Sequence, residues 1–304
     1  MLRVVFITII SLMQVLSAFT QQRIDIWEGR SMPNSKGLTI TDSVANHRVV
    51  RVGRPSLYRV APDKEKNRGI AVVICPGGGY QRYAWEVAGF DIANHFASKG
   101  ITSFVFTARL PLSEDVIEPE LVGTQDLQRA LRVIRYHALE WGIDPNRIGV
   151  EGSSAGGHLA ASSAIFNTPL YEGEDDIDTL NHMPDFQILV SPVISMKEPI
   201  THKGSRRSLL GDNPTPEQIE RFSLECGVGE WSAPSIMIHA NDDKTVPAEN
   251  SIEYYKALRR AGVESSLHIF NEGGHKISLE KQPIGTELWI DIVNRWMDNL
   301  FGEY

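Results

Sequence analysis

The chain has 304 residues, of which 42% are hydrophobic and 22% are charged, an ordinary balance for a globular protein. An excess of 38 Asp and Glu over 30 Lys and Arg gives a formal net charge of −8, which argues against binding to nucleic acid or to an anionic membrane. A local basic patch at Lys203, Arg206 and Arg207 could override this mean charge, although its sequence is more typical of a solvated loop. The two cysteines, Cys75 and Cys226, are too few and too far apart for a metal site or a disulfide framework.

The N-terminus has the layout of a secretory signal peptide, which we predict at residues 1–20. Arg3 supplies a positive charge, residues 4–16 are mostly apolar, and two small residues follow. The apolar stretch is shorter than the roughly 20 residues that span a membrane, and no cysteine near its end offers a lipid anchor. We therefore expect a secreted or periplasmic protein with one domain over residues 21–304.

Beyond an irregular segment at 25–45, the chain alternates between short apolar runs, typical of buried strands, and segments with helical spacing. The predicted strands cover 47–52, 57–60, 70–75, 101–107, 147–150, 186–190, 235–239 and 266–270, and the predicted helices cover 86–98, 124–140, 154–166, 248–261 and 287–300. Because Gly53 and Pro55 separate the first two strands, we expect these strands to form a hairpin. The alternation predicts an α/β fold with a mostly parallel sheet and helices on both of its faces. Residues 194–232, rich in Pro and Gly, interrupt the alternation and are predicted to form an insertion over the carboxyl edge of the sheet, where loops shape ligand sites.

Residues 152–156 read GSSAG and fit the Gly-x-Ser-x-Gly pattern of a nucleophile elbow. The context supports this interpretation, because a predicted strand precedes the motif and a predicted helix follows it. Such a turn is crowded, so glycines are expected at 152 and 156, and it places the hydroxyl of Ser154 at the positive end of the helix. The bare motif also fits a glycine-rich turn that happens to contain a serine.

A serine nucleophile needs a base and an acid, which in this fold follow it in the order acid and then histidine. His275 lies in Gly-Gly-His just past the last predicted strand, at the edge where the elbow lies, and is the predicted base. The acid is predicted to follow the strand at 235–239, where Asp243 is chosen and Asp242 remains the alternative. The other histidines that were considered are His158, in the helix of the nucleophile, and His239 and His268, which lie within predicted strands.

The oxyanion of an ester-hydrolysis intermediate needs backbone N–H donors, and two segments offer them. Ala155 follows the nucleophile, while Gly78 and Gly79 belong to a triple glycine after an earlier strand, where no side chain blocks the approach. The triple glycine does not fit a phosphate-binding loop, because no Lys-Ser or Lys-Thr pair follows it. His-Glu-x-x-His, Cys-x-x-Cys and a Gly-x-Gly-x-x-Gly after a strand are also absent from the sequence, so we expect no metal and no cofactor.

Seven motifs together resemble the secreted α/β-hydrolase carbohydrate esterases, the relatives of acetyl-xylan esterases and feruloyl esterases. They are residues 75–80 (CPGGGY), 141–149 (WGIDPNRIG), 152–160 (GSSAGGHLA), 201–206 (THKGSR), 210–214 (LGDNP), 239–243 (HANDD) and 273–275 (GGH). The resemblance covers about 47–300 and implies hydrolysis of acyl esters, most often O-acetyl esters, on plant polysaccharide. It implies the triad Ser154, Asp243 and His275, and an oxyanion hole of Gly78, Gly79 and Ala155.

The sequence departs from that family in residues 276–278 (KIS), where relatives often carry Gly-Phe. The resemblance therefore does not predict which side chains form the wall of the acyl pocket. Arg109 and Asp126 also match family positions, and we interpret them as a buried structural ion pair. Alternative functions are an esterase on other acylated glycans, such as sialic acids or pectin, and a peptidase resembling prolyl oligopeptidases, which would normally need a gating domain. A non-catalytic glycan binder is a further alternative, although such proteins lose triad members and this chain keeps all three candidates. The sequence gives no indication of an oligomeric state.

Overall fold

The computed structural model describes residues 22–279 and 285–302, so the predicted signal peptide at 1–20 lies outside the described residues. Its central sheet is built from β1 Gln22–Asp25, β4 Ser56–Val60, β5 Ala71–Cys75, β6 Thr102–Thr107, β7 Ile148–Ser153, β8 Gln187–Val190, β9 Ser235–Ala240 and β10 Ser265–Phe270. No helix within these described ranges is long and apolar enough to cross a membrane.

The strands lie in the order β1-β4-β6-β5-β7-β8-β9-β10, and those from β6 to β10 are parallel to one another. β4 pairs antiparallel with both β1 and β6. β5 and β7 lie at the centre, which explains why all five residues of β5 are buried and apolar. The parallel pairing places the carboxyl ends of β5, β7, β8, β9 and β10 at one edge of the sheet.

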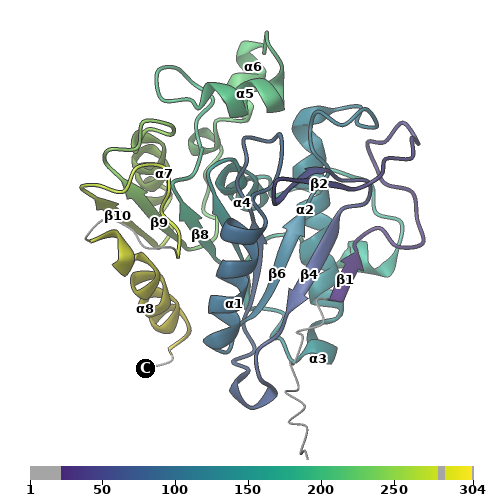
Figure 1. Cartoon of the computed structure of the whole chain (residues 1–304), viewed down its shortest axis with the longest axis horizontal. Helices are drawn as coiled ribbons and strands as arrows, with labels where there is room; N and C mark the ends of the chain where they lie inside the picture. The colour runs from purple at the N-terminus through teal and green to yellow at the C-terminus, as the bar shows by residue number, and fades with distance from the viewer. Residues whose placement is uncertain (1–21, 280–284, 303–304) are drawn as a thin grey trace, which may run out of the picture.

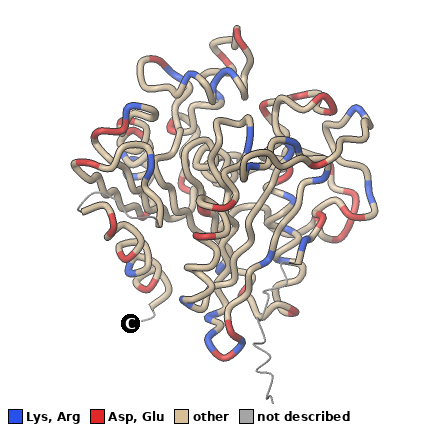
Figure 2. Tube along the Cα trace, in the orientation of Figure 1, with Lys and Arg blue, Asp and Glu red and all other residues tan. Residues whose placement is uncertain are grey.

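Helices cover both faces of this sheet (Figure 1). α1 Asp91–Ser98 and α8 Trp289–Phe301 pack on one face, and α2 Pro119–Tyr136, α4 Ala155–Ile165 and α7 Glu249–Arg260 pack on the other. Each face has its own apolar core. Lys, Arg, Asp and Glu are spread along the chain, many of them in the loops at the periphery (Figure 2). The predicted α/β fold class, a mostly parallel sheet with helices on both faces, is confirmed.

The shorter elements are α3 Ala138–Trp141, α5 Lys203–Leu210, α6 Pro216–Arg221, the 3-10 helices η1 Lys64–Lys66, η3 Asp176–Thr179, η4 Leu224–Cys226 and η5 Thr286–Leu288, and the π-helical turn η2 Glu86–Phe90. The segment 194–232 contains α5, α6 and η4, which lie above the carboxyl edge of the sheet (Figure 1). The basic residues Lys203, Arg206 and Arg207 lie on helix α5 and not in a loop, so that prediction was wrong. Cys75 is buried at the end of β5, Cys226 is exposed, and both are free.

The predicted hairpin between 47–52 and 57–60 is also wrong. β3 Arg48–Arg51 pairs with β2 Ser43–Ala45 in a separate two-stranded sheet. β4 has no free edge for β3, since β1 occupies one side and β6 the other. Gly53 lies between the two strands, where the backbone of Ile40 approaches so closely that a Cβ would lie 1.9 Å from its carbonyl oxygen.

Candidate active site

Ser154 lies in a tight turn between the end of β7 and the start of α4. Its backbone has φ 55° and ψ −126°, a conformation that costs a non-glycine residue about 1–3 kcal/mol. Hydrogen bonds hold it there, because its N–H donates to the carbonyl of Val190 (3.1 Å) and its carbonyl accepts from the N–H of Val193 (2.9 Å). The turn also needs glycine at position 156, where a Cβ would lie 2.0 Å from the carbonyl oxygen of Cys75. This strained turn at the start of a helix has the local geometry that the elbow motif predicts.

The structure brings together the three residues that the sequence proposed as nucleophile, base and acid. The hydroxyl of Ser154 donates to Nε2 of His275 at 2.8 Å, and Nδ1 of His275 donates to Oδ2 of Asp243 at 2.7 Å. They come from three loops at the carboxyl ends of β7, β9 and β10, which the parallel sheet places at one edge. Because Nδ1 carries the proton that binds Asp243, Nε2 is left free to accept a proton from the serine.

Asp243 is buried, and its environment keeps it ionised. Burial alone would raise the pKa of this carboxyl, but hydrogen bonds from His239, His275 and the N–H of Val246 outweigh burial and hold its pKa well below the ordinary value. Its other oxygen, Oδ1, accepts from the backbone N–H groups of Thr245 (2.8 Å) and Val246 (2.9 Å), which fixes the carboxyl plane. An ionised, immobile carboxylate in this position stabilises a positive charge on the imidazole of His275.

Asp242, the alternative acid, occupies a different position. It is exposed, and its Oδ1 accepts from the N–H of Gly274 at 2.7 Å, so it anchors the loop that carries His275. His158 is buried in α4, where Nδ1 bonds with the hydroxyl of Tyr80 and Nε2 donates to the carbonyl of Phe222, each at 2.8 Å. Burial lowers the pKa of His158 to about 4, so it is a neutral structural histidine.

The glycine loop after β5 lies directly against the turn that contains Ser154. A Cβ on Gly77 would lie 2.8 Å from the carbonyl oxygen of Ser153 and 3.1 Å from Cβ of Ser154. Within the described ranges, neither Gly78 nor Gly79 donates its N–H to another residue, and Ala155 is the first residue of α4, where amides lack a helical partner. These are the three amides that the sequence proposed for the oxyanion hole.

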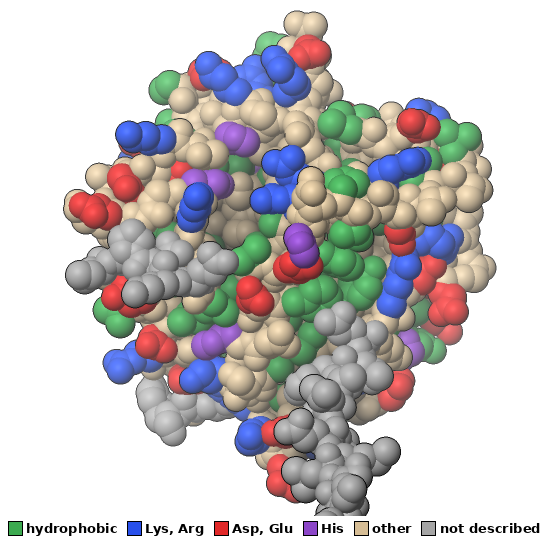
Figure 3. Space-filling model, in the orientation of Figure 1, with side chains coloured by type: hydrophobic (Ala, Val, Ile, Leu, Met, Phe, Trp, Pro, Cys, Tyr) green, Lys and Arg blue, Asp and Glu red, His purple; other side chains and the backbone are tan. Residues whose placement is uncertain are grey.

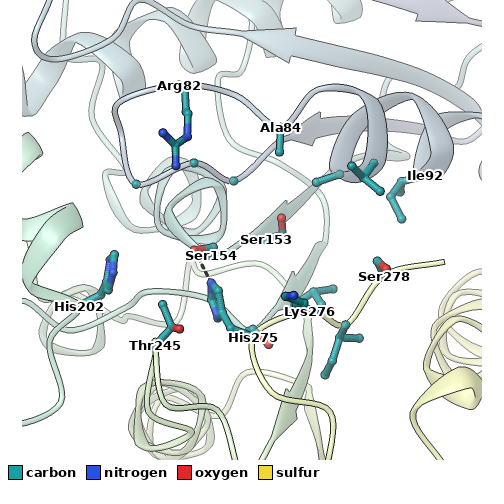
Figure 4. Close-up of a pocket in the computed structure, with 18 of the residues that line it drawn as sticks. Arg82, Ala84, Ile92, Ser153, Ser154, His202, Thr245, His275, Lys276 and Ser278 are labelled. Carbon is teal, nitrogen blue, oxygen red and sulfur yellow. Dashed lines mark hydrogen bonds between the residues drawn. The ribbon is translucent and has the colours of Figure 1, made fainter. Parts of the chain in front are cut away.

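A cavity of about 1010 Å³ opens over these groups, lined by Ser154, His275 and the loop 77–79. Figure 4 shows Ser154 in its middle, with His202 on one side and Ile92 and Ser278 on the other. The segment 194–232 supplies His202, whose Nδ1 bonds with Ser205, so α5 helps to shape the cavity. Burial, and to a lesser degree the nearby His275, lower the pKa of His202.

Sequence reasoning missed several residues that line the cavity. Lys276, Ile277 and Ser278 were recognised only as a departure from the family, while His202 was noted only within a family motif, and Arg82 and Glu151 were not singled out. Local sequence offered little signal for them, since they reach the cavity from different elements. Among the residues that the structure describes, no group of three or more His, Cys, Asp or Glu side chains could hold a metal ion.

The fold, with Ser154, His275 and Asp243 joined at the carboxyl edge of its sheet, defines this chain as an α/β-hydrolase. The model of the BD-FAE family matches residues 59–258, which is more than half of the chain. The chain belongs to the BD-FAE family, within the α/β-hydrolase esterases.

Two curated relatives lie close in sequence. An acetylxylan esterase of Xylanibacter ruminicola is 38% identical over 215 residues, which cover 69% of this chain and 42% of that protein. The endo-1,4-beta-xylanase B of Butyrivibrio fibrisolvens is 31% identical over 230 residues, which cover 74% of this chain and 35% of that protein. The aligned regions therefore span less than half the length of these two relatives.

Solved structures agree with this assignment. An acetyl ester-xyloside bifunctional hydrolase from Caldicellulosiruptor lactoaceticus is 31% identical and has a TM-score of 0.77, with 93% of this chain and 97% of that chain covered. The thermophilic esterase Est2 of Thermogutta terrifontis, with propionate bound, is 25% identical and has a TM-score of 0.66, with 89% of this chain and 94% of that chain covered.

Proposed function

We propose that this chain is a serine carboxylic-ester hydrolase that removes acyl groups, chiefly O-acetyl groups, from a plant polysaccharide such as xylan. The observation that carries the proposal is the hydrogen-bonded series of Ser154, His275 and Asp243, which opens on a cavity beside free backbone amides. The names of the similar proteins, an acetylxylan esterase and an acetyl ester-xyloside hydrolase, support the substrate.

In the proposed mechanism, Oγ of Ser154 attacks the ester carbonyl while Nε2 of His275 takes the hydroxyl proton. The N–H groups of Gly78, Gly79 and Ala155 stabilise the negative charge on the tetrahedral intermediate, and each such donor contributes roughly 10²- to 10³-fold in rate. The intermediate collapses as His275 returns its proton to the departing sugar oxygen, which leaves an acyl group on Ser154. Water, deprotonated by the same histidine, then attacks this acyl group and releases the acid.

Other glycans, such as acylated pectin or sialic acids, remain the second candidate, because the mechanism is the same for any sugar ester. Nothing in the site favours a peptidase or a non-catalytic binder over an esterase. We also propose that residues 1–20 direct export, so that the enzyme acts outside the cytoplasm on polymeric substrate.

The test is hydrolysis of 4-nitrophenyl acetate and release of acetate from acetylated xylan by the wild type and by Ser154→Ala. We expect the variant to lose at least several hundred-fold in kcat/KM on both substrates, because the nucleophile is gone while binding remains. Ser163→Ala is the matched control. Ser163 lies in the same helix with its hydroxyl bonded to the carbonyl of Ala160 at 2.7 Å, and it does not line the cavity.

Equal rates for the wild type and Ser154→Ala would mean that the serine mechanism is wrong. Acetate release from acetylated pectin or from O-acetyl sialic acid, but not from acetylated xylan, would keep the mechanism and change the substrate.

A further inference from the structure

The side chains that line the catalytic cavity fall into two sets by their burial, which we call the inner and the outer part. Buried side chains line the inner part, namely Ile92, Glu151, Val190, Ile277 and Trp289, and exposed side chains line the outer part, namely Arg48, Gln81, Arg82, Thr245 and Lys276. A polysaccharide must remain in solvent when its ester bond is cut, whereas an acyl group can be enclosed. The glycan of the proposed reaction therefore occupies the outer part and the acyl group the inner part.

Three cations from separate segments line the outer part. Arg48 lies on β3, Arg82 in the loop after β5, and Lys276 follows His275. Each is exposed, and none of the three side chains makes a hydrogen bond or ion pair with another residue in the described part of the chain. Figure 4 shows the side chain of Arg82 directed from its loop toward the cavity.

The basic residues of α5, just above the cavity, are different. Arg207 pairs with Asp212 at 2.8 Å, and Lys203 and Arg206 share Glu198 at 4.0 Å and 3.8 Å. The cations that line the outer part thus lack the acidic partners that the three basic residues of α5 have.

Among the described residues that line the cavity, no anion balances the three cations. Glu151 is the single carboxyl in this described lining. It is 2% exposed, and burial raises its pKa to about 8, so it is uncharged at neutral pH. The described lining therefore carries a positive charge in a protein whose formal net charge is −8. Figure 3 shows the hollow in this face with Lys or Arg side chains on both of its sides.

We propose that the glycan this site accepts carries a carboxylate close to the esterified sugar, as a uronic acid or a sialic acid does, and that Arg48, Arg82 and Lys276 bind this carboxylate. The inference rests on the proposed function and narrows its substrate. Guanidinium groups bind carboxylates through paired hydrogen bonds, and Lys276 adds a mobile point charge. Cations around a cleft also concentrate an anionic substrate near it, an effect that salt weakens.

The first test compares acetate release from two acetylated xylo-oligosaccharides, one with a glucuronate side group and one without. The triple variant Arg48→Gln, Arg82→Gln, Lys276→Gln is expected to lower the acidic-to-neutral ratio of kcat/KM by roughly three- to thirtyfold, as for three exposed ion pairs. The control triple variant is Lys64→Gln, Lys99→Gln, Arg260→Gln, which removes the same charge from exposed positions that do not line the cavity.

We expect the control to keep the wild-type ratio of kcat/KM between the acidic and the neutral substrate. We also expect about 0.5 M NaCl to lower this ratio in the wild type. An equal change of the ratio in both triple variants would contradict the inference.

A binding measurement separates this inference from the proposed function. Calorimetry on Ser154→Ala at low salt compares a glucuronate-bearing xylo-oligosaccharide, its neutral counterpart and sialyllactose. Tighter binding of the glucuronate compound supports a uronic acid, and tighter binding of sialyllactose supports a sialic acid. If neither acidic sugar binds more tightly than the neutral one, the inference is wrong even for an active esterase. If binding favours an acidic sugar while the wild type hydrolyses no ester, the proposed function fails, and only the binding of a sugar carboxylate by this cavity stands.

Discussion

Asp242 and Asp243 are adjacent in sequence, yet the turn after β9 sends their carboxyls to different partners. Asp243 is 6% exposed and bonds with the imidazole of His275, whereas Asp242 is exposed and accepts from the backbone N–H of Gly274. The first position can stabilise an imidazolium during catalysis, and the second can only support a loop.

We therefore predict different losses from the same chemical change at the two positions. Asp243→Asn is expected to reduce kcat on 4-nitrophenyl acetate by about 10³- to 10⁴-fold, because a neutral amide cannot hold the productive tautomer of His275 or stabilise its charged form. Asp242→Asn is expected to lose less than about tenfold, because its amide oxygen can still accept from Gly274. Initial rates of the two variants and the wild type at one pH test which aspartate is the acid. Comparable losses of kcat in the two variants would mean that the acid is assigned wrongly.

At the scale of residues, the sequence predicted the positions of those side chains that belong to local motifs. Ser154 and His275 each follow a predicted strand within a glycine-flanked motif, so their place at one sheet edge follows from topology. His239 was interpreted as core, and it is fully buried, but its contact with Asp243 at 3.5 Å was not foreseen. Such contacts depend on how a turn folds back on its strand, which spacing does not reveal.

At the scale of elements, β7 carries an unusual residue for a central strand. The register places Glu151 beside Ile74 of β5 and Ile188 of β8, and Oε2 of this carboxyl is buried without a hydrogen-bond partner among the described residues. Burial raises its pKa from an ordinary value of 4.5 to about 8. The folded protein therefore holds a proton between these two pH values that the unfolded chain has lost.

This proton makes folding stability depend on pH. The pKa of Glu151 is higher in the folded protein than in the unfolded chain, so protonated Glu151 contributes fully to the free energy of unfolding below about pH 4.5. This contribution is lost as pH rises through about 8. The total change in the free energy of unfolding is on the order of 4–5 kcal/mol. Glu151→Gln cannot ionise, so we expect it to gain stability relative to the wild type as pH rises from 5 to 9. Urea unfolding at several pH values measures this, with Glu65→Gln as an exposed control, and parallel pH profiles for the wild type and Glu151→Gln would refute the prediction.

Element boundaries were predicted less well where packing decides them. Helix α2 begins at Pro119, five residues before the predicted start, because proline suits the first helical position. Gly123 lets this first part of α2 pack closely on α4, since a Cβ there would lie 3.2 Å from Cδ1 of Leu159. Strands β1 and β2 have four and three residues, too short for a periodic pattern, and become strands through their partners β4 and β3. Pairing of this kind depends on contacts that are distant in sequence.

At the scale of the whole molecule, one buried network joins three distant segments. Arg109, after β6, pairs with Asp126 of α2 at 2.7 Å, and the two side chains are 1% and 0% exposed. The same carboxylate accepts from the indole N–H of Trp27 at 2.9 Å, and Arg109 also donates to the carbonyl of Pro33 at 2.6 Å. The predicted structural ion pair is confirmed, and it ties the segment after β1 to the main body.

Removing one charge from this network should destabilise the fold without changing the chemistry. Asp126→Asn keeps an oxygen that can accept from Trp27 but leaves the guanidinium of Arg109 buried without a counter-charge, which costs about 3–5 kcal/mol. In a chain of this size we expect Tm to fall by roughly 6–20 °C, while kcat/KM at 25 °C stays near that of the wild type because neither residue lines the cavity. Asp63→Asn, which removes an exposed pair with Lys66 (2.9 Å), should change stability by less than about 0.5 kcal/mol. A loss of activity in Asp126→Asn below its melting range would mean that the network also positions the site. An unchanged Tm would contradict the prediction, because it would mean that the charge of Arg109 needs no ion pair with Asp126 to be stable in the core.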